Sequence, residues 1–284
     1  MMETTEAQPL TNDNFECIAS EAETLAAYLQ KFIVPLFRLG QSKHPEQFAT
    51  GFLVEYKDNS YLVSAAHVLD EVERKDCKIG FPVGLKQFRN LHPVGLMTRL
   101  PETQNRSDDK LDVAVLRLVG SGMPPYAEAG RAAMPFEWLL RGPAIGRDIY
   151  LLIGFPASKA DINRREETQT SAYLPIVAAP ASETAFKEQG LRAGDHIGLT
   201  WKKRGIRGGG NRRTSPVGMR GMSGAPIFVT LSDHDPAPER GVAVAGILIE
   251  HKKQSGGVLV VTKADIARDM ILRLSETADS CTSS

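Results

Sequence analysis

Short apolar runs rich in β-branched and aromatic residues recur along this chain, and turn-forming residues separate them. Residues 51–56 and 61–64 flank the polar segment 57–60, which is the pattern of an antiparallel hairpin. Further runs of this kind occupy residues 111–118, 149–153, 196–201, 225–230, 242–250 and 257–262. Short, closely spaced strands joined by turns predict an all-β protein.

The strand-like runs fall into two series along the sequence. A connector rich in Pro and Gly at residues 120–125, followed by an irregular stretch to residue 146, separates the two series. Two six-stranded antiparallel sets joined by such a linker predict two small β-barrels. The first is expected over about residues 32–120 and the second over about residues 146–262.

Helical patterns flank the two predicted barrels. Residues 20–30 lack Gly and Pro and favour a short helix, which completes an N-terminal polar region over residues 1–31. Residues 263–274 carry apolar residues at helical spacing, which predicts a C-terminal helix packed on the second barrel. The folded domain is therefore expected over residues 32–274, with a flexible polar tail over residues 275–284.

Composition excludes several classes of protein and of partner. Lys plus Arg equals Asp plus Glu at 34 each, so no net charge favours a nucleic acid or an anionic membrane as partner, and we expect neither. Cys17, Cys77 and Cys281 are odd in number and widely separated, which predicts neither a disulfide framework nor a zinc site. The sequence starts without a secretory signal and contains no run of membrane-spanning length, which predicts a cytoplasmic protein.

One serine lies in a local sequence that suits a nucleophile. The segment Gly221-Met222-Ser223-Gly224-Ala225-Pro226 directly precedes an apolar strand. Glycine before the serine permits a turn whose amide hydrogens point outward, where they can bind the oxyanion of a tetrahedral intermediate. Because Gly-x-Ser-Gly also occurs as an ordinary surface turn, this interpretation requires partner residues elsewhere in the chain.

A histidine and an aspartate supply the candidate partners. His67 follows an apolar run that ends in small residues, which leave room for an imidazole to face a cleft. Asp112 stands within an otherwise apolar run, where a carboxylate is costly unless it is paired. Each has a structural alternative, since a lone histidine at a strand end is usually structural and an aspartate can cap a turn. Together they give the order His, Asp, Ser along the chain.

These segments resemble the trypsin-like (chymotrypsin-fold) serine peptidase family. The resemblance rests on residues 51–54, 63–67, 111–116 and 221–226, and it continues through residues 244–247 and 256–263. It covers about residues 32–274 and implies barrels of the chymotrypsin type.

The resemblance also implies a mechanism. Ser223 attacks a peptide carbonyl, His67 takes and returns the proton, and Asp112 holds the histidine tautomer. The backbone amides of Gly221 and Ser223 form the oxyanion hole, and an acyl-enzyme is then hydrolysed by water without cofactor or metal. The expected partner is a protein or peptide substrate.

The sequence also departs from the family in ways that bear on activation and specificity. Met222 occupies the place where animal digestive relatives have an aspartate that pairs with a newly cleaved amine, so we expect no activation of that kind. Val217, six residues before the nucleophile, and Ile249, on the strand flanking the cleft, predict an apolar substrate pocket. A small or aliphatic residue before the cleaved bond fits such a pocket.

Other interpretations differ in the features they require. Residues 201–213 are basic and rich in glycine, and we expect a solvated loop beside the site rather than a nucleic-acid contact. An α/β-hydrolase needs glycine two residues after the serine, where this chain has Ala225. The remaining alternative is a catalytically silent trypsin-like binding or sensor module. With no peptide-binding domain following, substrate choice is expected to come from cleft loops or from a regulatory protein partner.

Overall fold

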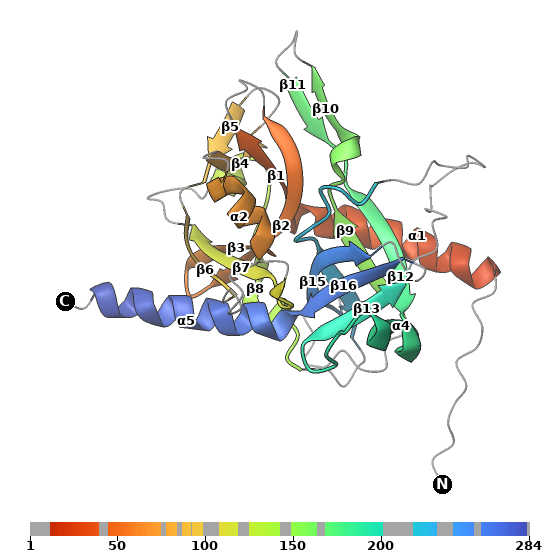
Figure 1. Cartoon of the computed structure of the whole chain (residues 1–284). Coiled ribbons are helices and arrows are strands. Elements are labelled where there is room, and N and C mark those ends of the chain that lie inside the picture. The colour runs from red at the N-terminus through yellow and green to blue at the C-terminus, as the bar shows by residue number, and fades with distance from the viewer. Residues whose placement is uncertain are drawn as a thin grey trace.

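A computed structural model places the chain as a mostly β protein with a helix near each end (Figure 1). The terminal helices are α1, Asn12–Leu29, and α5, Ala264–Thr282. The structure describes residues 12–39, 45–74, 78–83, 87–91, 93–98, 108–118, 125–142, 149–163, 168–200, 218–231, 241–252 and 257–282.

Strands of the first half form one eight-stranded sheet in the order β5-β4-β1-β2-β3-β7-β6, with β8 paired in parallel to β2. Their bounds are β1 Ile33–Leu39, β2 Glu46–Tyr56, β3 Asn59–Ala65, β4 Lys78–Val83, β5 Gln87–Asn90, β6 Pro93–Met97, β7 Val113–Leu118 and β8 Met134–Pro135. The predicted hairpin joins β2 to β3 through Lys57 and Asp58, which both have positive φ, as a two-residue type I′ turn requires.

Closure of this sheet into the predicted first barrel is not found. The two outer strands of the sheet, β5 and β6, would have to pair with each other, and no such pairing is present among the described residues. The first half is therefore an open sheet over the part of the chain that the structure describes.

Strands of the second half form the predicted six-stranded antiparallel barrel, which is closed in the order β12-β13-β16-β15-β14-β9. Their bounds are β9 Tyr150–Gly154, β12 Leu174–Pro180, β13 His196–Thr200, β14 Pro226–Thr230, β15 Val242–Lys252 and β16 Val258–Lys263. Strand β12 did not stand out in the sequence because Pro175 and Pro180 break its strand pattern. A separate hairpin of β10, Ala160–Asn163, and β11, Thr168–Ser171, projects from the body of the protein (Figure 1).

Helices differ most from the sequence-based expectations. Helix α1 begins at Asn12 rather than near residue 20, and α5 continues to Thr282, so the tail predicted to be flexible is helical almost to its end. Its residues include no Gly or Pro, so no strong helix breaker ends the helix, although Ser, Thr and Asp are weaker helix formers. The remaining helical elements are η1 Gln30–Phe32, α2 Ala66–Arg74, α3 Pro125–Glu128, η3 Phe136–Trp138, η4 Ala157–Lys159 and α4 Glu183–Glu188.

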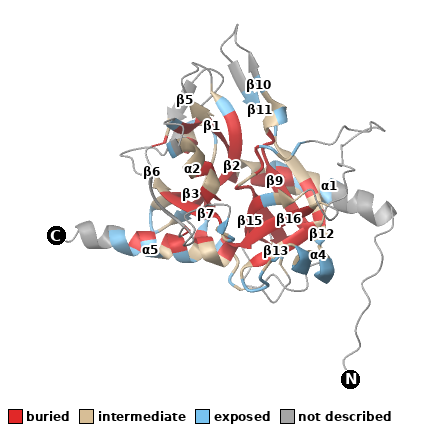
Figure 2. Ribbon diagram, viewed as in Figure 1, coloured by how far each residue is buried: buried red, intermediate tan, exposed pale blue. Residues whose placement is uncertain are grey.

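Buried residues continue from one half of the molecule into the other (Figure 2), and the apolar ones form three clusters. One cluster lies under the first sheet and another lies inside the barrel, while a third spans both halves and includes Phe52, Phe155 and Phe228. Both terminal helices contribute to this shared cluster, through Leu29 of α1 and Ile271 of α5. Helix α5 contacts β6 and β7 of the first sheet as well as β15 and β16, so it packs on both halves and not on the barrel alone. Within the described residues, no helix is both long and apolar enough to cross a membrane.

Candidate active site

His67 and Asp112 are held together by two hydrogen bonds that the carboxylate of Asp112 accepts from His67. The imidazole Nδ1 of His67 lies 2.5 Å from Oδ2 of Asp112, and the backbone N–H of His67 donates to Oδ1 over 2.8 Å. His67 is the second residue of helix α2, whose first residue, Ala66, donates its N–H to the carbonyl of Asp112 over 2.9 Å. Asp112 therefore satisfies free amides at the start of this helix and orients the imidazole at the same time.

Asp112 lies one residue before strand β7, and not inside the strand as its apolar neighbours suggested. Its φ is 46°, in the left-handed region that few residues other than glycine adopt, although aspartate tolerates it better than most. Asp109 stabilises the turn that precedes Asp112, since its Oδ1 accepts the N–H of Leu111 over 3.0 Å. Thr98 completes the turn, because its hydroxyl donates to Asp109 and accepts the N–H of Val113. The local sequence thus directs the carboxylate out of the sheet and toward His67.

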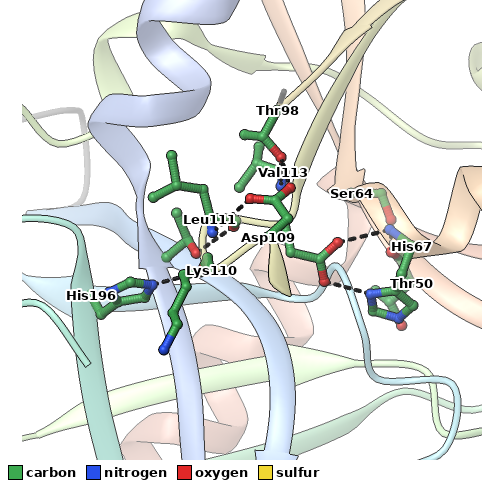
Figure 3. Close-up of polar contacts among 11 residues, drawn as sticks. Thr50, Ser64, His67, Thr98, Asp109, Lys110, Leu111, Val113 and His196 are labelled. Atoms are coloured by element: carbon green, nitrogen blue, oxygen red, sulfur yellow. Dashed lines mark hydrogen bonds and ion pairs between the residues drawn. The ribbon is translucent and has the colours of Figure 1, made fainter. Parts of the chain in front are cut away.

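Two side chains of the closed barrel form hydrogen bonds with the segment just before Asp112. Nε2 of His196, at the start of β13, lies 2.6 Å from the carbonyl oxygen of Lys110. The hydroxyl of Thr262, in β16, donates to the carbonyl of Leu111 over 2.6 Å. Both side chains are buried. In Figure 3, Lys110 and Leu111 lie between His196 and His67, so contacts from the barrel help to hold the acid–base pair of the first half.

Electrostatics in this pair favour a positive imidazole. Burial lowers the pKa of His67, but the hydrogen bond and negative charge of Asp112 outweigh it and raise the pKa above the ordinary value, with smaller contributions from Glu71 and Asp70. Burial raises the pKa of Asp112, and the hydrogen bonds and charge of His67 oppose that rise. The imidazole is still reachable, because 39% of the His67 side chain is exposed against 10% for Asp112. His67 is therefore suited to accept a proton from a group in solvent or in a bound ligand.

Two successive turns shape the segment around Ser223. The N–H of Met222 donates to the carbonyl of Met219, and the N–H of Ala225 donates to the carbonyl of Met222, each over 3.0 Å. The third residues of these turns are Gly221 and Gly224, with φ of 90° and 86°. A positive φ at that place is what a type II turn requires, and it favours glycine.

Both glycines are also required by packing. A Cβ at Gly221 would lie 2.6 Å from the backbone nitrogen of Ala157 and 2.8 Å from the carbonyl oxygen of Phe155. A Cβ at Gly224 would meet the hydroxyl of Ser64 and the carbonyl of Thr50. The turns therefore pack against the segment just after β9 on one side and against β2 and β3 on the other.

The backbone amides of residues 221–225, called here the nucleophile segment, differ in whether they have a hydrogen-bond acceptor. Those of Met222, Gly224 and Ala225 donate to backbone carbonyls, whereas those of Gly221 and Ser223 donate to no acceptor among the described residues. The carbonyl of Arg220 accepts the N–H of Ala157 over 2.8 Å. Because the C=O and N–H of a trans peptide point in opposite directions, the N–H of Gly221 points away from Ala157. Two amides on either side of Met222 are thus left for a ligand.

Contacts with strands β2 and β3 of the first sheet place Ser223 near the end of β3, which His67 follows. The carbonyl of Ser223 accepts the N–H of Thr50 in β2 over 2.9 Å, and Gly224 lies against Ser64 and Ala65, which precede His67 by only a few residues. Ser223 is partly exposed. Its hydroxyl makes no hydrogen bond to His67 in the described part of the chain. Such bonds are often long without substrate and tighten when it binds.

The predicted pocket residues have different outcomes. Ile249 is 7% exposed and packs into the apolar cluster under the first sheet. It is the extra residue of a β-bulge, since Leu248 pairs with Val261 and Glu250 with Val260, its neighbour. Val217 and the basic segment 201–213 lie outside the described residues.

Sequence reasoning missed three polar residues that support this site. Thr50, His196 and Thr262 are buried and donate or accept hydrogen bonds next to the predicted triad. Threonine is common in strands, so Thr50 and Thr262 carry no distinctive signal in sequence. His196 did carry one, because it is a histidine at the start of an apolar strand.

No group of three or more His, Cys, Asp or Glu side chains is arranged to hold a metal ion over the residues that the structure describes. No protein-family model matches this sequence, and no curated protein matches it either. Membership of the trypsin-like family therefore stays a prediction, based on the motifs in the sequence.

Proposed function

We propose that this protein is a serine endopeptidase of the trypsin-like (chymotrypsin) type, with Ser223, His67 and Asp112 as its triad. The observation that carries the proposal is the pair of amides at Gly221 and Ser223, which have no acceptor among the residues that the structure describes, on a turn packed near the His67–Asp112 pair. An oxyanion hole needs two such donors next to the nucleophile. The open first sheet and the closed barrel would together correspond to the two barrels of that fold.

Proton transfer in the proposed reaction follows from the contacts of His67. Nε2 takes the proton of the Ser223 hydroxyl as Oγ bonds to the substrate carbonyl carbon, and Asp112 stabilises the imidazolium through Nδ1. The carbonyl oxygen becomes an oxyanion that accepts hydrogen bonds from the amides of Gly221 and Ser223. The C–N bond then breaks, and the amine leaves with the proton from Nε2. Water attacks the acyl-enzyme by the same route and restores the serine.

The resemblance implies that Val217 forms an apolar floor of the substrate pocket, and on that basis we propose a small or aliphatic residue before the cleaved bond. Hydrolysis of a synthetic peptide library, read by mass spectrometry, tests both the activity and this preference. We expect cleavage mainly after Ala, Val or similar residues by the wild type, and none above background by Ser223→Ala prepared in the same way. Equal cleavage by the two proteins would contradict the proposal, and cleavage mainly after Lys or Arg would overturn the apolar pocket.

A further inference from the structure

We propose that Thr50 is a positioning residue that fixes the Gly221 amide in the orientation needed to bind an oxyanion. The inference rests on the proposed function, and it adds a residue from the first sheet to a site whose nucleophile belongs to the second half. Thr50 does not touch the substrate in this proposal. It acts through Gly221.

Thr50 is fully buried in β2, where the first sheet meets the second half of the chain, and all its polar groups form hydrogen bonds there. Its N–H donates to the carbonyl of Ser223 over 2.9 Å, and its hydroxyl donates to the carbonyl of Gly221 over 2.7 Å. The hydroxyl also accepts the N–H of Phe155 over 2.9 Å, and the carbonyl accepts the Ser64 hydroxyl over 2.8 Å. Because Phe155 supplies a proton to Oγ1, the single hydroxyl proton is directed to Gly221.

Gly221 needs such support because glycine has the widest range of backbone conformations. The peptide before Gly221 is held by the bond from Ala157 N–H to the Arg220 carbonyl. The peptide after it is held by the bond from the Thr50 hydroxyl to the Gly221 carbonyl. The first bond sets the direction of the Gly221 N–H, and the second fixes the peptide that follows, so together they hold this N–H relative to the N–H of Ser223. The N–H of Met222 also holds this second peptide through its bond to the carbonyl of Met219, so loss of the Thr50 bond removes one of two restraints on ψ of Gly221.

The test compares Thr50→Val and Thr50→Ser with the wild type. Valine keeps the volume and the backbone N–H of residue 50 but removes the hydroxyl, whereas serine keeps the hydroxyl. The probe is a peptide aldehyde whose P1 residue matches the best library substrate, because its adduct with Ser223 carries an oxyanion and an unreacted peptide does not. The inhibition constant of the aldehyde therefore reports the oxyanion hole, and KM for the matching peptide amide reports substrate binding.

We expect Thr50→Val to weaken aldehyde inhibition about tenfold or more, below the 10²–10³-fold loss that removal of an oxyanion donor causes. KM should stay within about twofold, and Thr50→Ser should behave as the wild type. Ser64→Ala is the matched control, because it removes a buried hydroxyl that also bonds Thr50 but does not contact Gly221. It should lose thermal stability without losing aldehyde affinity. If Thr50→Val does not fold, Thr50→Ala removes the same hydroxyl with less bulk.

Three results would overturn the inference. Aldehyde inhibition could be unchanged in Thr50→Val, it could fall equally in Thr50→Ser, or the inhibition constant and KM could rise together. Each would show that Thr50 only stabilises the fold. A wild-type protein whose Ser223 forms no aldehyde adduct and which cleaves no peptide would instead contradict the proposed function, and the inference with it.

Discussion

The acid–base pair and the nucleophile segment are positioned by different means. His67 and Asp112 are oriented by side-chain contacts, and the turn before Asp112 is stabilised by Asp109, Thr98 and Thr262. The segment around Ser223 is oriented mainly by backbone hydrogen bonds and by two glycines with positive φ, with one side-chain bond from the Thr50 hydroxyl. Substitutions at the pair should therefore change chemistry while leaving the fold intact, whereas substitutions in the segment should move its backbone.

The largest effect is expected from Asp112→Asn, which changes only the chemistry of the pair. The amide cannot stabilise an imidazolium, and it favours the wrong tautomer of His67, so kcat should fall about 10⁴-fold with little change in KM. Steady-state kinetics on a peptide substrate measure this loss, and circular dichroism checks the fold. A decrease in kcat of less than about tenfold in a folded variant would show that Asp112 does not take part in catalysis.

The same pair predicts the pH dependence of the reaction. Only neutral His67 accepts the serine proton, so activity should fall as pH decreases through the pKa of His67, which Asp112 raises above its ordinary value. Removal of the carboxylate in Asp112→Asn removes the main cause of that rise. The acid limb of its residual activity should therefore lie at lower pH than that of the wild type. An acid limb at the same pH in both proteins would contradict this assignment.

The nucleophile segment should tolerate no side chain at Gly221. In Gly221→Ala the new Cβ would meet the backbone of Ala157 and Phe155, so kcat should fall about 10²–10³-fold, as when an oxyanion donor is lost. Gly130→Ala is the matched control, because Gly130 also has positive φ but has no atom within 4 Å of the added Cβ. It should lose about 1 kcal/mol of stability and keep full activity. Similar kcat values for the two variants would show that Gly221 does not contribute to the active site.

A smaller effect is expected where the barrel holds the acid–base pair. Thr262→Val removes the hydroxyl bond to Leu111, which should cost about 1 kcal/mol of unfolding free energy and lower kcat a few-fold. Thr200→Val is a suitable comparison, because its hydroxyl also bonds a carbonyl of this barrel, that of Ala179, away from Asp112. Chemical denaturation and kinetics measured together distinguish them. Equal kcat in the two variants would show that the contact with Leu111 serves stability alone.

The smallest effect is expected at the outer edge of the nucleophile segment. Arg220 pairs with Glu46 of β2 over 2.7 Å, and both side chains are largely exposed. Such a pair contributes about 0.2–1 kcal/mol and is screened by salt. Arg220→Gln removes this pair and leaves the bonds from Arg38 to Glu46 in place, so it should change activity less than about threefold at low ionic strength and not at all in 0.5 M NaCl. A larger change that persists in salt would make this pair part of the site.

Sequence patterns predicted those parts of the protein that local signals define. The hairpin from β2 to β3 follows from its turn residues, and β9, β13, β14, β15 and β16 follow from apolar runs within one or two residues of the observed bounds. The closed barrel was predicted because these runs form a second series of strands, which the linker after residue 120 separates from the first series. The N-terminal boundary of α1 and the end of α5 were missed because their polar residues suit both a helix and a solvated tail.

Other features depend on contacts between distant residues. The start of helix α2 at Ala66 depends on Asp112, which lies over forty residues away and caps its free amides, so His67 seemed to end a strand. The support from Thr50 depends on strand β2 meeting the second half, and neither its position nor its composition signals this role. Ile249 was predicted to line a pocket, and its burial at a β-bulge depends on the packing of the two halves.

Reaction with a fluorophosphonate tests most directly whether Ser223 is an assembled nucleophile. The purified full-length protein and Ser223→Ala are treated side by side, and the modified residue is located by peptide mass spectrometry. We predict one covalent adduct per chain, on Ser223, that disappears in Ser223→Ala and after denaturation of the wild type. Absence of an adduct on Ser223 in the folded wild type would contradict the account and indicate a silent binding module.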